Sequence, residues 1–225
     1  MIINNGYFTG ELYLAEAKPS MTSEVKDVES KLNDFIDDYV PDCILKCFGN
    51  KLGYEFIAEL DSTEENGLKA SADAKWDDLL NGTTYTDSNG DSQVWKGMRW
   101  KSNTEGKYNR SFLASYVYYH FESNDDSHRT GAGNFRIEAA NAISVSKNHK
   151  VVKAWRKFVK LVQGELSTSP YSVKSGQYGG FITDYYTGDE EINLYQFIVD
   201  SNDLVADTYA DFNPKNWKNM NQLGI

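Results

Sequence analysis

The chain has 225 residues, of which 40% are hydrophobic and 14% aromatic, and this composition excludes an intrinsically disordered protein. Its formal net charge of −10 argues against a general nucleic-acid binder, because neutralising phosphates requires many Lys and Arg side chains. No apolar run approaches the ~18 residues that span a bilayer, and the first twenty residues lack the basic and apolar regions of a signal peptide.

Residues 1–20 are punctuated by Gly and Asn and are predicted to form an N-terminal extension. A helix is predicted to begin at Ser23, a good N-cap residue followed by acidic side chains that the helix dipole favours. Pro41 is expected to break or restart this helix, since proline has no N–H for the helical ladder. Apolar residues at helical spacing form one stripe: Val25, Val28, Leu32, Phe35, Ile36 and Tyr39.

The next segment, residues 41–60, is apolar enough to lie at the centre of the fold. Its two glycines indicate a break in the helix or a close contact between helices. A polar linker follows over residues 61–70. A short helix is then predicted between an N-cap at Ser71 and a C-cap at Gly82.

A β-hairpin is predicted within residues 84–101, where polar and aromatic residues alternate. The Asn-Gly dipeptide at 89–90 is typical of a type I′ turn. The acidic residues around it also alternate as in an EF-hand calcium loop. However, Ser92 occupies the position of the required glycine and Met98 that of the required glutamate, so the pattern favours a turn.

Two helices are predicted in the second half of the chain. Residues 110–123 form an aromatic helix, and residues 124–134 a loop. The second helix ends near Gly164 and carries an apolar stripe of Val, Trp and Phe. Residues 147–164 contain no acidic residue and six basic ones: Lys147, Lys150, Lys153, Arg156, Lys157 and Lys160.

Beyond residue 165 the helical periodicity weakens, and residues 166–225 are predicted to form an extended C-terminal arm that needs a body or a neighbour to lie against. Residues 165–213 hold nine acidic residues and one basic residue, Lys174. An acidic arm could therefore lie on the basic helix of the same or a neighbouring subunit. Six aromatic residues are candidate interface anchors: Tyr185, Tyr186, Tyr195, Phe197, Tyr209 and Trp217.

No catalytic signature is recognisable in the sequence. Adjacent acids such as those at 37–38 and 77–78 are typical of solvated helix faces, and the three His residues show no paired spacing. The glycines at 131–133 lack the rest of a dinucleotide fingerprint. Cys43 and Cys47 are too few for a structural zinc site and are expected to be reduced core thiols. We therefore expect no enzyme activity, no cofactor, no metal, and folding in a reducing cytoplasm.

Five segments occur in a characteristic order: "KWDDLLNGTTY", "VWKGMRW", "SFLASYVYYHF", "RTGAGNFRIEAANAISVSKNHKVVKAWRKFV" and "FNPKNWKNMNQLGI". In their order and residue composition, these segments resemble those of the head–tail connector (adaptor or ring) proteins of tailed bacteriophages, particularly those of crAss-like phages. The resemblance covers roughly residues 23–165 and the last dozen residues, and no catalytic motif contributes to it. An arm beyond residue 166 is longer than a minimal adaptor needs.

This resemblance implies a virion structural protein, made in the host cytoplasm, with a mainly α-helical bundle over residues 21–165. Such proteins form a ring, commonly of twelve copies, beneath the portal, where they extend the DNA channel and offer the tail a docking surface. The implied partners are copies of the chain itself, the portal protein, and other ring or tail proteins. Non-specific contact with packaged DNA is a further implication, and a membrane is not expected.

Other interpretations stay open at this stage. The basic helix, residues 147–160, could be a solvated face, could contact DNA, or could pack against an acidic protein surface. A cytosolic DNA-binding protein would use the same helix. A carbohydrate- or surface-binding module is the remaining alternative, because the chain holds 15 Tyr and 5 Trp and places Trp95 and Trp100 in the predicted hairpin.

Overall fold

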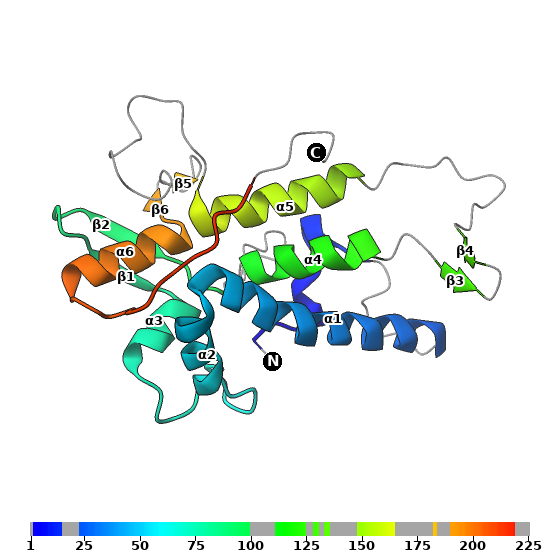
Figure 1. The fold of residues 1–225 in the computed structure, drawn as a ribbon, viewed down its shortest axis with the longest axis horizontal. Helices are drawn as coiled ribbons and strands as arrows, with labels where there is room; N and C mark the ends of the chain where they lie inside the picture. The colour runs from blue at the N-terminus through cyan, green and yellow to red at the C-terminus, as the bar shows by residue number, and fades with distance from the viewer. Residues whose placement is uncertain are drawn as a thin grey trace.

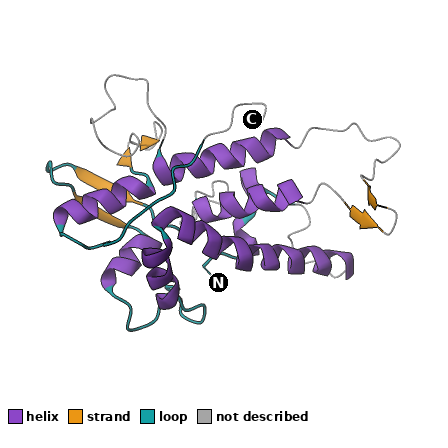
Figure 2. Ribbon diagram, viewed as in Figure 1, coloured by secondary structure: helices purple, strands orange, loops and turns teal. Residues whose placement is uncertain are grey.

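A computed structural model describes residues 2–14, 23–99, 111–124, 128–130, 133–135, 148–164, 182–183 and 190–218. Within these ranges the fold is mainly helical with a small antiparallel hairpin, which confirms the predicted fold class (Figures 1 and 2). The α-helices are α1 (Ser23–Phe48), α2 (Asn50–Glu59), α3 (Ala74–Asn81), α4 (Phe112–Asn124), α5 (Asn148–Gln163) and α6 (Leu194–Leu204). Two short 3-10 helices precede them, η1 (Asn5–Tyr7) and η2 (Gly10–Leu12).

Helix α1 continues through Pro41, so the predicted break at this proline is wrong. Buried side chains one turn before and one turn after the proline, such as Ile36 and Ile44, hold both halves of the helix against the core. The helix ends instead at Gly49, whose φ is +85°. A Cβ atom at this position would lie 2.8 Å from the carbonyl oxygen of Asn213, so both the backbone and the space require glycine.

Helix α4 lies between α1 and α5 and forms the centre of the fold (Figure 1). Its residues from Phe112 to Tyr118 are all buried. The Tyr116 ring links the layers, with its centroid 6.3 Å from that of Tyr39 in α1 and 4.9 Å from that of Phe158 in α5. A helix that is apolar on every side is expected in such a central position.

Helix α3 begins two residues later than predicted. Its N-cap is Asp73 rather than Ser71, and the Asp73 carboxylate accepts a hydrogen bond from the Lys75 N–H at 3.1 Å. The predicted C-cap at Gly82 is confirmed, because this residue has a φ of +94° and donates its N–H to the Asp78 carbonyl.

The predicted hairpin is formed by β1 (Thr83–Thr86) and β2 (Ser92–Trp95). Its loop spans residues 87–91, and Asn89 does not have the positive φ that a type I′ turn requires, so the predicted turn type is wrong. The buried Asp87 carboxylate accepts hydrogen bonds from the N–H groups of Asn89 and Asp91, at 2.9 and 3.0 Å. This side chain therefore shapes the longer turn.

The hairpin belongs to a sheet of strand order β1-β2-β6-β5, in which β6 (Glu190–Glu191) pairs parallel to β2, and β5 (Ile182–Thr183) pairs antiparallel to β6. A second hairpin, β3 (His128–Thr130) with β4 (Gly133–Phe135), lies where a loop was predicted. These strands are too short for sequence periodicity to reveal them.

The C-terminal segment that precedes residue 219 lies on the helical core (Figure 1), so for residues 190–218 the body that the predicted arm needs is the chain's own core. Because α1 stops at Gly49, its last carbonyl groups lack helical partners. The Asn213 N–H bonds to the Phe48 carbonyl at 3.0 Å, and the Lys215 N–H bonds to the Lys46 carbonyl at 2.9 Å. The end of α1 thus provides a docking place for this segment.

Candidate interaction surface on helix α5

Helix α5 has two chemically distinct sides because its basic and apolar residues both recur every three to four positions. One side packs into the core through the buried residues Ala154, Phe158, Val159 and Val162. The other side carries the predicted basic residues, and we name this side the basic face: His149, Lys150, Lys153, Arg156, Lys157 and Lys160. Lys147, the remaining predicted residue, lies outside the described residues.

Part of the basic face forms a depression. Lys150, Lys153 and Arg156 are exposed, while Lys157 and Lys160 are partly buried. A depression of about 450 Å³ is lined by Glu11, His149, Val152, Lys153, Arg156, Lys157 and Lys160. The depression gathers four permanent cations of the predicted set, and Val152 contributes apolar surface. Such an arrangement suits an anionic group attached to a less polar surface.

One carboxylate of the chain itself occupies this surface. Glu11, on η2, accepts a hydrogen bond from the Lys153 ammonium at 2.8 Å and lies 3.5 Å from that of Lys157. The hydrogen bond from Lys153 holds the pKa of Glu11 below its ordinary value. The sequence could not indicate this pairing, because the partners are 142 residues apart. The pair shows that the basic face accepts a carboxylate.

The predicted anchor Trp217 is buried within its own chain. Its ring centroid lies 4.8 Å from that of Phe158 and 5.7 Å from that of Trp155, both on α5. The Gln163 side-chain amide accepts from the Trp217 N–H at 2.9 Å and donates to its carbonyl at 2.7 Å. The prediction that Trp217 anchors a neighbouring subunit is therefore wrong.

Three other predicted anchors are buried in the same way. The Tyr195 hydroxyl donates to the Lys215 carbonyl at 2.7 Å, and the Phe197 ring stacks on Trp95 at a centroid distance of 5.4 Å. The Tyr209 hydroxyl donates to the backbone of α3. These rings are therefore covered by other parts of their own chain: the C-terminal segment, β2 and α3. The other two predicted anchors, Tyr185 and Tyr186, lie outside the described residues.

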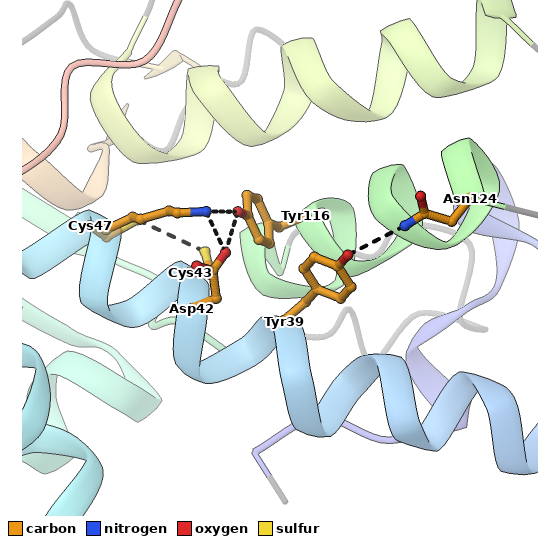
Figure 3. Close-up of polar contacts among 7 residues, drawn as sticks. Tyr39, Asp42, Cys43, Cys47, Tyr116 and Asn124 are labelled. Carbon is orange, nitrogen blue, oxygen red and sulfur yellow. Dashed lines mark hydrogen bonds and ion pairs between the residues drawn. The ribbon is translucent and has the colours of Figure 1, made fainter.

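A polar cluster connects α1 with α4 (Figure 3). The Asp42 carboxylate accepts from the Lys46 ammonium at 2.6 Å and from the Tyr116 hydroxyl at 2.7 Å. Burial raises the pKa of Asp42, but these two hydrogen bonds and the positive charge of Lys46 together leave the pKa below its ordinary value. Cys43 and Cys47 are free, buried thiols with their Sγ atoms 3.9 Å apart, as predicted for core residues.

His120 lies beside this cluster, stacked on Tyr39 with ring centroids 4.1 Å apart. Its Nε2 atom is buried without a hydrogen-bond partner. Burial lowers the pKa of His120 to about 4, and the Lys46 ammonium contributes to the same direction. The imidazole is therefore neutral at pH 7, and charging it in the folded state is unfavourable.

We expect this histidine to make stability depend on pH. Between the ordinary pKa of 6.5 and the folded value of about 4, the unfolded chain binds a proton that the folded chain does not. Stability contributed by the neutral ring is therefore lost as the pH falls through this window. Between pH 7 and pH 5, the free energy of unfolding should fall by about 1–2 kcal/mol less for H120F than for wild type.

Urea denaturation at the two pH values measures this difference. The exposed His149 provides a matched control substitution, H149Q. Equal pH dependence of wild type and H120F would contradict the assignment.

The pairs of adjacent acids noted in the sequence lie on helices α1 and α3. Asp37 and Asp38 are exposed on α1, and Asp77 is exposed on α3. Among the described residues, no three His, Cys, Asp or Glu side chains gather where they could hold a metal ion. Within the same ranges, no helix combines the length and the apolar character needed to cross a membrane.

Comparison of the chain with protein-family models, curated proteins and solved structures finds no match.

Proposed function

We propose that this chain is a structural subunit of a phage head–tail connector, which assembles with copies of itself into a ring beneath the portal. The basic face of α5 is the observation that carries the proposal. A chain with a net charge of −10 gathers exposed cations on one helix side, over a shallow depression rather than a deep pocket. Surfaces of this kind select and orient charged macromolecules.

Two further features support a structural role. The order of the helical elements and the aromatic character of α4 are features on which the sequence resemblance to connector proteins rests. Helix α5 is also firmly held: Phe158 contacts the rings of Tyr116 and Trp217, with centroids 4.9 and 4.8 Å away. A rigid support for a charged surface keeps the cost of ordering that surface on binding low.

Assembly of the purified chain tests this function. We expect native mass spectrometry and electron microscopy to detect a closed ring of one subunit type, either alone or with the portal protein of the same phage. A chain that stays monomeric at every concentration and ignores the portal would contradict the proposal.

A DNA-binding protein is the second candidate, and the same basic depression favours it. Its test is a gel-shift titration of double-stranded DNA against salt, because phosphate contacts require a steep fall in affinity with salt. The surface-binding alternative loses one of its motivations. The Trp95 ring is buried, and its indole N–H donates to the Leu79 carbonyl at 2.9 Å.

A further inference from the structure

Helix α1 also has two distinct sides. Phe35, Tyr39 and Asp42 make its contacts with α4. At 3.6 residues per turn, Ile36, Val40 and Ile44 are rotated around the helix from that contact by about a quarter to a half turn. This second side of α1 meets α2 and the loop that follows α2.

Between these elements lies a small groove with a volume of about 130 Å³. Most of its lining is apolar: Ile2, Ile36, Val40, Pro41, Ile44, Ile57 and Leu60. Its charged lining residues are both acidic, Asp37 and Asp61. Asp34 is exposed on α1 one turn before Asp37. We name this surface, with the three aspartates, the acidic groove.

The acidic groove and the basic face are separate surfaces, because no residue lines both. The basic face lies on α5, and the groove lies between α1 and α2; Figure 1 shows where these helices lie. Each subunit therefore presents negative charge on one surface and positive charge on another. Contact between these two surfaces of neighbouring copies would bring opposite charges together.

Resting on the proposed connector function, we propose that the basic face of α5 in one copy binds the acidic groove between α1 and α2 of the next copy. The contact is heterologous, because it joins different surfaces of two identical chains. Contacts of this type form a closed ring when the rotation between neighbours divides a full turn.

The chemistry of the two surfaces fits this pairing. Lys and Arg side chains cover apolar surface with their aliphatic stems and extend their charged ends to carboxylates at the edge. The groove provides both, with the partly exposed Ile57 and Leu60 in its lining together with the exposed Asp37. The contact of Glu11 with Lys153 already shows that the basic face accepts carboxylates. DNA offers phosphates along its backbone but no apolar groove of this kind.

Charge reversal on each surface tests the proposal. The face variant is K150E/R156E, and the groove variant is D34K/D37K; all four residues are exposed, and none of them takes part in the Glu11 pair. Each variant alone brings like charges together in every contact. We expect each to weaken self-association at least ~10-fold.

Mixing the two variants is the decisive measurement. In an equimolar mixture every contact between unlike subunits again joins opposite charges, so we expect assembly to return to within ~3-fold of wild type. Matched controls are K218E and D203K, which change exposed charges outside both surfaces and should assemble as wild type. Circular dichroism and melting temperature verify that each variant folds.

The possible outcomes separate this inference from the proposed function. If wild type assembles and neither reversal affects it, the assignment of the two surfaces is wrong while the connector function stands. If wild type never assembles, with or without the portal, the connector function fails and the inference fails with it. If K150E/R156E loses only its binding to double-stranded DNA in a gel shift, the basic face serves DNA and the inference is wrong.

Discussion

Replacement of Trp217 by alanine is expected to lower the free energy of unfolding by about 3–5 kcal/mol, the range for removing a buried Trp side chain. The ring is 5% exposed and lies against Phe158 and Trp155 of α5. Its indole N–H also donates to the Tyr195 hydroxyl at 3.0 Å. The substitution would leave a cavity where the C-terminal segment meets α5 and α6, so both contacts of that segment would weaken.

Urea denaturation followed by circular dichroism measures this loss. W217F retains most of the apolar volume and loses the hydrogen bond, so it should cost about 1–2 kcal/mol. K218A changes the exposed neighbour and should be close to neutral. If W217A cost no more than K218A, the C-terminal segment would not be docked on the helical core in solution.

Substitution of Gly97 by alanine is expected to cost about 2–4 kcal/mol, which combines the strain of a positive φ with overpacking. Gly97 has a φ of +85°. A Cβ atom here would lie 2.5 Å from the Asn81 carbonyl carbon and 2.6 Å from the Gly82 nitrogen. Residues 97–99 lie directly against the end of α3, and the backbone of both segments would have to move.

Gly90 provides a matched control because it has nearly the same backbone conformation, with a φ of +89°, and no atom within 4 Å of the added Cβ. G90A should therefore lower the free energy of unfolding only by the strain of the positive φ, about 1 kcal/mol. Thermal and urea unfolding of the two variants separate the strain from the crowding. Equal losses for G97A and G90A would show that the contact between α3 and residues 97–99 relaxes easily.

Local sequence signals were sufficient for several features of this protein. The spacing of basic and apolar residues in α5 predicted a helix with a charged side, and Gly82 predicted the end of α3, since both depend on neighbours within a few residues. The break predicted at Pro41 failed for the opposite reason. Packing on both sides of that residue outweighs the one hydrogen bond that proline removes.

The C-terminal segment illustrates a different limit. Its aromatic residues were correctly recognised as groups that need a surface to cover them, but the sequence left open whether that surface belongs to the same chain or to a neighbour. The structure decides this for Tyr195, Phe197, Tyr209 and Trp217, which are all buried within the chain. Burial inside one chain is favoured because no entropy of association is lost.

The sequence by itself determined the helical class of this protein, the hairpin and the existence of one basic helix side, because periodicity and glycine placement act over short distances. Only the tertiary structure decided that Glu11 meets Lys153, that the C-terminal rings lie on α5 and α3, and that an acidic groove forms between α1 and α2. These features depend on which distant residues share the same space. That choice is made by the packing of the whole core, to which every helix contributes and which no local pattern encodes.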